Sequence, residues 1–237
     1  MQKKRTLRFD QYNPLFVKDL DLFQLALGLE APWYVSSSSF DAEKRRLDIN
    51  IDFLPGSSFC CPDCGREGMK AYDTSAATWR HLNFFQHEAY LTARVPRIRC
   101  PECGIVKLKS FSWARRQSGF TLLFEAMIMA MAKSMPVNAI AAIIGEHDTR
   151  LWRIIHYYVD QARLQEDYSA VTSVGVDETS SKRGHKYVTL FADLTTSKVL
   201  FVTEGKDAST VQRFLDDLVA HRGKPASITD FCSDMSP

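Results

Sequence analysis

The amino-acid sequence predicts an α+β multidomain protein. Three observations along the 237 residues support this class. Two cysteine motifs of the same pattern stand in the first half of the chain. Residues 120–164 repeat apolar side chains at the helical period, and residues 171–237 contain short apolar runs bounded by turn residues, which is typical of strands.

The composition is that of an ordinary globular protein, with 45% hydrophobic and 24% charged residues. No apolar run approaches the ~20 residues that a membrane span needs. Residues 1–30 also lack the apolar core and the cleavage site of a signal peptide. We therefore expect a cytoplasmic protein with no membrane partner.

The net charge of +2 is unevenly distributed along the chain. Residues 61–119 hold ten Lys and Arg against five Asp and Glu, whereas residues 171–237 hold eight against nine. A basic module beside an acid-containing domain suits a protein that holds a polyanion and acts on it through a metal. Scattered, solvated charge is equally compatible with these totals.

Residues 1–58 predict a short helix followed by a β-hairpin. The first ten residues carry four cations, and we interpret them as a frayed terminus rather than a basic arm. Residues 18–29 have apolar side chains at helical spacing, which predicts the helix. Residues 33–40 and 47–53 predict the strands, because the second alternates apolar with polar residues. We expect this hairpin to pack beside the cysteine module.

The strongest local motif is a pair of C-P-acid-C-G knuckles within residues 59–116. The four thiols belong to Cys61, Cys64, Cys100 and Cys103, with 35 residues between the two knuckles. Paired thiols of this kind, each pair followed by a glycine that relieves a tight turn, favour a tetrahedral zinc site. The long gap predicts a hairpin, with strands at residues 79–85 and 88–95. We therefore predict a zinc ribbon whose zinc is structural.

Two other interpretations of these cysteines fit less well. A disulfide framework does not suit a cytoplasmic chain, and a thioredoxin-like redox pair needs a single motif in a β-α-β context. We interpret the remaining Cys60 and Cys232 as small buried residues.

Cations and aromatic residues are interleaved around the second knuckle, a pattern that suits phosphate contacts and base stacking. The alternative is that the aromatic residues form the core of this small module. We predict that the basic face contacts DNA. The residues concerned are Arg94, Arg97, Arg99, Arg115 and Arg116.

Residues 117–165 predict three helices in a helix-turn-helix arrangement. The expected spans are residues 120–133, 136–144 and 149–164, with Gly145 in the turn. A short helix, a glycine-containing turn and a longer helix form the pattern that DNA-binding domains use. Three-helix bundles with this spacing also occur in proteins that do not bind DNA.

The first and third of these helices carry specific expectations. In the first, we expect Leu123, Met127 and Ala130 to form the inward stripe. The third is the expected DNA reader, with Arg150 and Arg153 placed to meet phosphate or guanine.

Residues 171–237 predict three strands, a helix and a fourth strand. The two later strands are expected at residues 185–193 and 198–203, and the helix at 207–221, with Asp193 capping the turn between strands. Asp177 ends the first apolar run and Asp234 ends the last. If the last strand runs parallel beside the first, the two aspartates meet and offer hard oxygen ligands to a divalent cation. Asp230 is a competing candidate for the second position.

This last segment resembles the opening half of the RNase H-like DDE domain of bacterial insertion-sequence transposases. The closest group has an N-terminal zinc finger (the ISL-three group). The matching residues are Gly175-Val176-Asp177-Glu178, Gly184-His185-Lys186-Tyr187, Asp193-Leu194, Gly205 and Asp234-Met235. The resemblance implies that Asp177 and Asp234 are the first two catalytic acids and hold magnesium or manganese. It also implies binding to terminal inverted repeats and a homo-oligomer on DNA.

The third acid of that family, a Glu on a later helix, has no counterpart in the sequence. We therefore expect a C-terminally truncated transposase that cannot transpose alone, located at the bacterial nucleoid. One alternative is a zinc-dependent DNA-binding remnant or regulator without catalysis. Another is an RNase H-like nuclease that acts outside transposition.

Overall fold

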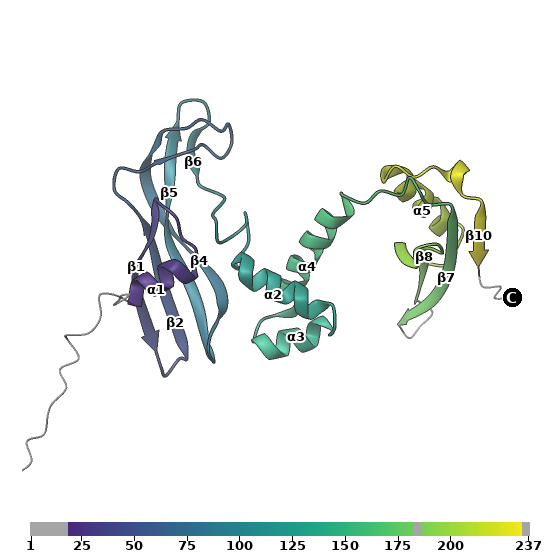
Figure 1. The fold of residues 1–237 in the computed structure, drawn as a ribbon, viewed down its shortest axis with the longest axis horizontal. Helices are drawn as coiled ribbons and strands as arrows, with labels where there is room; N and C mark the ends of the chain where they lie inside the picture. Colours follow the sequence, from purple (N-terminus) through teal and green to yellow (C-terminus); the bar gives the residue numbers. More distant parts are fainter. Residues whose placement is uncertain (1–18, 183–185, 234–237) are drawn as a thin grey trace, which may run out of the picture. The chain divides into compact units, whose positions relative to one another are not determined.

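The computed structural model describes residues 19–182 and 186–233. The chain forms two compact units, Met1–Ile154 and Ile155–Pro237, which are described in turn (Figure 1). Within the described ranges, no helix is both long and apolar enough to span a membrane.

The first unit is built on one six-stranded sheet, ordered β1-β2-β5-β4-β3, with β6 paired to β5. Its elements are α1 (Asp19–Ala26), β1 (Trp33–Asp41), β2 (Arg46–Phe53), β3 (Ser58–Phe59), β4 (Met69–Phe84), β5 (His87–Cys100) and β6 (Gly104–Lys107). The predicted N-terminal helix and hairpin are confirmed. The strands between the knuckles are much longer than residues 79–85 and 88–95.

Strand β2 joins the N-terminal hairpin to the strands of the cysteine module. It runs parallel to β5, with Ile49 beside Leu91 and Ile51 beside Ala93. All four side chains are buried, as the alternation of β2 requires for a strand with one face in a core. The expected boundary between residues 58 and 59 therefore lies inside one continuous sheet.

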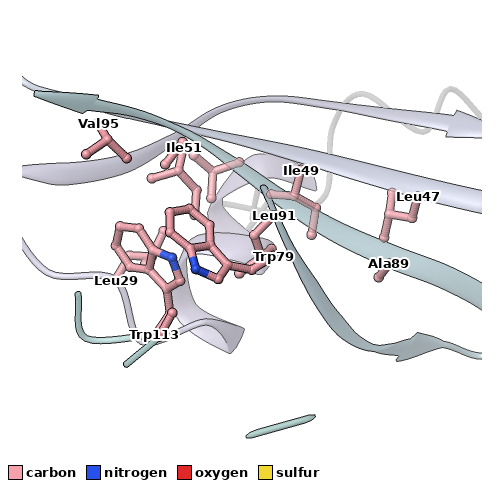
Figure 2. Packing of buried hydrophobic residues seen from close by; sticks show 12 residues of the cluster. Leu29, Leu47, Ile49, Ile51, Trp79, Ala89, Leu91, Val95 and Trp113 are labelled. Carbon is pink, nitrogen blue, oxygen red and sulfur yellow. The ribbon is translucent and has the colours of Figure 1, made fainter. Parts of the chain in front are cut away.

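One buried cluster of this unit is built on the apolar side chains of β2 and β5. Figure 2 shows Trp79 and Trp113 packed together against the aliphatic side chains of β2 and β5. The two indole rings meet edge to face, with centroids 5.8 Å apart, a favoured geometry for aromatic pairs. Helix α1 covers the same cluster, because its Leu20 and Phe23 pack against it, as does Leu27 just after the helix. Trp79, Phe111 and Trp113 thus belong to a core, which was the alternative to base stacking, whereas Tyr72 and Phe85 are exposed.

The three predicted helices follow as α2 (Leu122–Ala132), α3 (Val137–Ile144) and α4 (Asp148–Arg163). The hydroxyl of Thr121 accepts a hydrogen bond from the Phe124 amide at the start of α2. Gly145 ends α3 in the left-handed conformation, with φ of 69°, where glycine is the favoured residue. Helix α4 buries Leu151 and Ile154.

The predicted inward stripe of α2 was wrong. Leu123 is 53% exposed, whereas Phe124, Glu125 and Ile128 are buried. Every position of this helix except Glu125 is apolar. The spacing of apolar residues therefore could not indicate which face of the helix is buried. Phe124 and Ile128 pack inward, and the carboxylate of Glu125 is buried on the same face.

The second unit contains a four-stranded sheet ordered β10-β7-β8-β9. Its elements are β7 (Ser173–Lys182), β8 (Lys186–Asp193), β9 (Lys198–Glu204), α5 (Ser209–Ala220), the 3-10 turn η2 (Pro225–Ser227) and β10 (Asp230–Ser233). Strands β7, β8 and β9 are antiparallel neighbours. Strand β10 lies parallel beside β7, in the arrangement that the sequence suggested for a helical crossover.

Helix α5 packs on one face of this sheet (Figure 1). The rings of Phe191 and Phe214 stack with centroids 4.3 Å apart, and Leu218 is fully buried with them. The helix does not bury every apolar side chain, since Val219 is 56% exposed. At the β8–β9 turn, Asp193 caps the chain as expected, accepting hydrogen bonds from Thr195 N and Thr196 Oγ1.

Candidate metal centre and nucleic-acid interface

The four knuckle cysteines come together at one end of the first sheet. All of their sulfur atoms lie within 4.8 Å of one another, and Cys64 Sγ is 3.6 Å from Cys100 Sγ. Tetrahedral zinc with Zn–S bonds of ~2.3 Å needs thiolates ~3.8 Å apart. The glycines that follow, Gly65 and Gly104, both have φ of 76°, so they relieve the turns as predicted.

The surroundings of the cluster favour the thiolate form of Cys61, which is the form that binds a metal ion. The backbone N–H groups of Cys64 and Asp63 point at the sulfur of Cys61 and lower the pKa of this thiol to about 7. Neighbouring thiols, Cys64 foremost, raise the pKa of Cys103. Crowding four such groups is unfavourable unless a cation neutralises the thiolates. The donor set therefore fits zinc.

The remaining cysteines do not behave as the sequence suggested. Cys60 and Cys232 are exposed, and all six cysteines are free thiols. The prediction that these two are small buried residues was wrong, because Cys60 lies just outside the knuckle and Cys232 lies on an edge strand. The 3.6 Å between Cys64 Sγ and Cys100 Sγ exceeds the ~2.05 Å of a disulfide bond.

The arginines on β5 are exposed, but each has a partner within the sheet. Arg94 forms an ion pair with Asp52 at 2.8 Å. Arg97 donates from Nε to Asp73 at 2.6 Å, and Arg99 lies over the ring of Tyr72 at 4.3 Å. These contacts orient the guanidinium groups and offset part of their charge.

Around the helices the arginines divide into anchored and solvent-facing groups. Arg115 donates from Nε to Glu125 at 2.9 Å, and Arg150 pairs with Glu146 while lying 4.3 Å from the centroid of the Phe120 ring. Arg116 and Arg153 are exposed.

A buried polar network near α2 escaped the sequence analysis. The side chain of Arg80 is 2% exposed and lies 3.7 Å from Glu88 and 3.9 Å from Glu146. Its guanidinium also donates to Asn83 Oδ1 and to the carbonyl of Ala89. The contact between Arg80 and Glu146 connects β4 to the turn before α4. Glu146 also binds Arg150, which extends the network into α4. No sequence signal marked Arg80 as buried, because β4 also carries the charged residues Lys70 and Asp73.

In the second unit, Asp177 lies within β7 rather than at its end. The strand continues to Lys182 because β7 and β8 form a long antiparallel pair. Val176 packs against the buried cluster beneath α5, so strand alternation places Asp177 on the opposite face of the sheet. Asp177 is exposed there and pairs in register with Leu190.

The second predicted acid, Asp234, lies outside the described residues, as does His185. The parallel register of β10 with β7 is described as far as Ser233, which lies beside Val176. Asp230 lies beside Ser173, four positions before Asp177 along β7. The register therefore separates this competing candidate from Asp177.

Comparison with known protein families matches three successive segments. Residues 57–103 match the zinc-finger of transposase IS204/IS1001/IS1096/IS1165, and residues 110–159 match the helix-turn-helix domain of transposase family ISL3. Residues 174–237 match a transposase domain of the same family. These segments are, in order, the parts of an insertion-sequence transposase. The chain carries the zinc-finger, helix-turn-helix and transposase domains of the ISL3 family.

Individual relatives agree with this assignment. The chain is 30% identical over 230 residues to the transposase for insertion sequence element IS1557 of Mycobacterium tuberculosis, covering 92% of this chain and 50% of the relative. It is 25% identical over 165 residues to the transposase for insertion sequence element IS1001 of Bordetella parapertussis, covering 67% and 39%. The chain thus spans about half the length, or less, of these curated relatives. No solved structure matches it.

Proposed function

We propose that this chain supplies the DNA-binding parts and the first two catalytic acids of an insertion-sequence transposase. The zinc module and the helices bind the terminal inverted repeats of the element, and the second unit takes part in metal-dependent cleavage and transfer of DNA strands. The observation that carries the proposal is the parallel pairing of β10 with β7, which is described up to the residue beside Val176.

That pairing supports an RNase H-like arrangement of the second unit. Three antiparallel strands followed by a helical crossover to a parallel strand beside the first bring two distant segments together. Asp177 follows Val176 on β7, and Asp234 follows Ser233 in the sequence. On this basis we propose that Asp177 and Asp234 hold magnesium or manganese, which would position the phosphate and activate the attacking oxygen.

The zinc has a structural role in this proposal. The cysteine cluster lies at the end of the sheet where β5 ends and β6 begins. It packs against Phe59, Ile98 and Val106. Four protein ligands leave no open position for a reacting molecule. The proposed DNA contacts of the first unit come from Arg94, Arg97, Arg99, Arg115, Arg116, Arg150 and Arg153.

DNA binding tests the first part of this proposal. The purified zinc-loaded chain is mixed with a duplex carrying the inverted repeat of its element and with a scrambled duplex of the same length. We expect tighter binding to the repeat, at stated salt, because affinities for DNA depend steeply on ionic strength. Equal affinity for both duplexes at every salt concentration would contradict recognition of the repeat.

Metal binding tests the second part and separates it from the alternative of a DNA-binding regulator. Mn²⁺ is titrated into the zinc-loaded chain while the paramagnetic broadening of backbone NMR signals is followed. We expect broadening centred on Asp177 that is lost in Asp177→Asn and retained in Glu178→Gln. Strand alternation places Glu178 on the other face. Identical broadening in the wild-type chain and Asp177→Asn would favour the regulator.

A further inference from the structure

A small hollow lies where residues 115–120 meet the first turns of α4. Its volume is about 190 Å³. The residues that line it include Arg115, Gln117, Ser118, Gly119, Arg150 and Arg153. We call this hollow the arginine pocket. Three guanidinium groups around one small space form a setting for an anion with several oxygen atoms.

Two of the three arginines are fixed in place by buried carboxylates. Glu125 is completely buried and accepts from Arg115 Nε. The side chain of Glu146 is 9% exposed and binds Arg150, whose guanidinium also lies over Phe120. Side chains already held in one conformation lose little entropy on binding, so the pocket is organised in advance for a ligand.

The local charge remains positive despite these carboxylates. Glu125 and Glu146 face three lining arginines, and Glu146 is also shared with the buried Arg80 at 3.9 Å. Within residues 19–182 and 186–233, Arg153 forms no ion pair, and its side chain is exposed. Arg153 is therefore the arginine of the pocket whose charge no carboxylate offsets.

The basic lining extends beyond the pocket into a second, larger one of about 390 Å³. The two share Arg115, Gln117 and Ser118. The cations of the larger pocket are Lys107, Lys109, Arg115 and Arg116. Lys109 is paired with Asp63. Basic residues that line two adjoining pockets suit an extended polyanion better than a single small anion.

We propose that the arginine pocket binds one backbone phosphate of the DNA, and that Arg150 and Arg153 contact phosphate rather than base edges. This inference rests on the proposed DNA-binding function. A guanine contact needs a guanidinium that offers both of its donors to O6 and N7. Arg150 is instead committed to Glu146 and to the face of Phe120. Phosphate contacts fix the register of a protein on DNA and carry no sequence information.

The substitution Arg153→Gln tests the proposal, with Arg45→Gln as its control. Both residues are exposed, and both changes remove one positive charge, but Arg45 lies in the turn between β1 and β2. Binding is measured on the inverted-repeat duplex and on a scrambled duplex across a salt series. We expect Arg153→Gln to weaken binding several-fold on both duplexes and to reduce the slope of log K against log salt by about one. Arg45→Gln should leave both values close to those of the wild-type chain.

A second measurement locates the contact on the DNA. Single phosphates of the repeat are replaced in turn by neutral methylphosphonates. At one position the replacement should weaken the wild-type chain and have no further effect on Arg153→Gln. An effect of Arg153→Gln on the repeat alone would indicate base reading and overturn the proposal, as would equal effects of the two substitutions. Failure of the wild-type chain to bind any DNA would overturn the proposed function along with it.

Discussion

The carboxylate of Glu125, on α2, accepts a hydrogen bond from Arg115 Nε over 2.9 Å. Its second oxygen accepts from Ser118 Oγ over 2.6 Å. Glu125 is fully buried, and the side chain of Arg115 is 18% exposed. This largely desolvated ion pair therefore joins α2 to the segment that precedes it. Each buried charge needs the other to offset its desolvation.

Replacing Glu125 with Ala should destabilise the first unit by about 3–5 kcal/mol, because it leaves the guanidinium of Arg115 without its buried partner. Urea unfolding followed by tryptophan fluorescence measures this unit alone, since all four tryptophans lie before residue 155. The control is Glu102→Ala, which removes an exposed partner of Arg66 and should cost less than about 1 kcal/mol. Similar costs for the two variants would show that burial of the pair is unimportant.

The cysteine cluster should hold one zinc ion per chain. We expect Cys100→Ala to release the zinc and to loosen the sheet end around Ile98 and Val106, which pack against the cluster, because a structural zinc contributes directly to folding. The matched control is Cys60→Ala, which removes an exposed thiol outside the cluster. Elemental analysis gives the zinc content, and hydrogen exchange reports the local loss of protection. Full zinc content in Cys100→Ala would mean that the ion binds elsewhere.

The sequence predicted those features that depend on local patterns. The paired knuckles predicted the cysteine cluster, and the alternation in residues 47–53 predicted which side chains of β2 are buried. The order of elements after residue 171 predicted a parallel last strand, because a helical crossover permits that direction. Each of these expectations rests on spacing within a few residues or on chain connectivity.

The remaining features depend on contacts that spacing does not encode. The parallel pairing of β2 with β5 links residues about 40 positions apart in sequence, and no motif marks it. Glu125 is buried because Arg115 and Ser118 reach it from an irregular segment. Arg150 was expected to meet phosphate or guanine, and its ion pair with Glu146, four residues earlier, was not part of that expectation. These features depend on which residue lies beside each side chain in the fold, and the type of the residue alone does not predict that.

Lowering the pH should destabilise the first unit through His81. Burial, and secondarily the charge of Arg80, lowers the pKa of His81 below its ordinary value of 6.5. The folded state therefore binds this proton less readily than the unfolded state. The stability is complete above the unfolded pKa and declines as the pH falls below it. His81→Gln should show a smaller loss of unfolding free energy than the wild-type chain between about pH 7.5 and about pH 5.5, a range that brackets the ordinary histidine pKa. Urea titration at each pH measures this loss.

The control for this pH experiment is His147→Gln, which replaces an exposed histidine near α4. It should retain the pH dependence of the wild-type chain. Protonation of the zinc ligands affects all three proteins alike, so the comparison isolates His81. Identical pH dependence in His81→Gln and the wild-type chain would contradict a role for this buried imidazole.

Two glycines of the second unit should respond differently to the same substitution. A β-carbon on Gly223 would lie 2.5 Å from Leu218 Cδ1 and 3.0 Å from the carbonyl oxygen of Leu218, a residue that is fully buried. A β-carbon on Gly175 would lie 2.6 Å from Leu194 Cδ2, but Leu194 is 48% exposed and can turn toward solvent. Gly223→Ala should therefore destabilise this unit by about 1–3 kcal/mol, and Gly175→Ala by clearly less.

Hydrogen exchange of peptides from β8 measures this difference, because the second unit contains no tryptophan. In Gly223→Ala the β-carbon meets backbone as well as side chain, so α5 must shift, which disturbs the stacking of Phe214, on α5, against Phe191, on β8. Exchange should then accelerate across β8, where Phe191 lies, and in α5. Gly175→Ala should alter exchange mainly near residues 173–177 and the β8–β9 turn. Equal acceleration in both variants would mean that the buried Leu218 and the exposed Leu194 accommodate the added methyl group equally well, which would contradict the prediction.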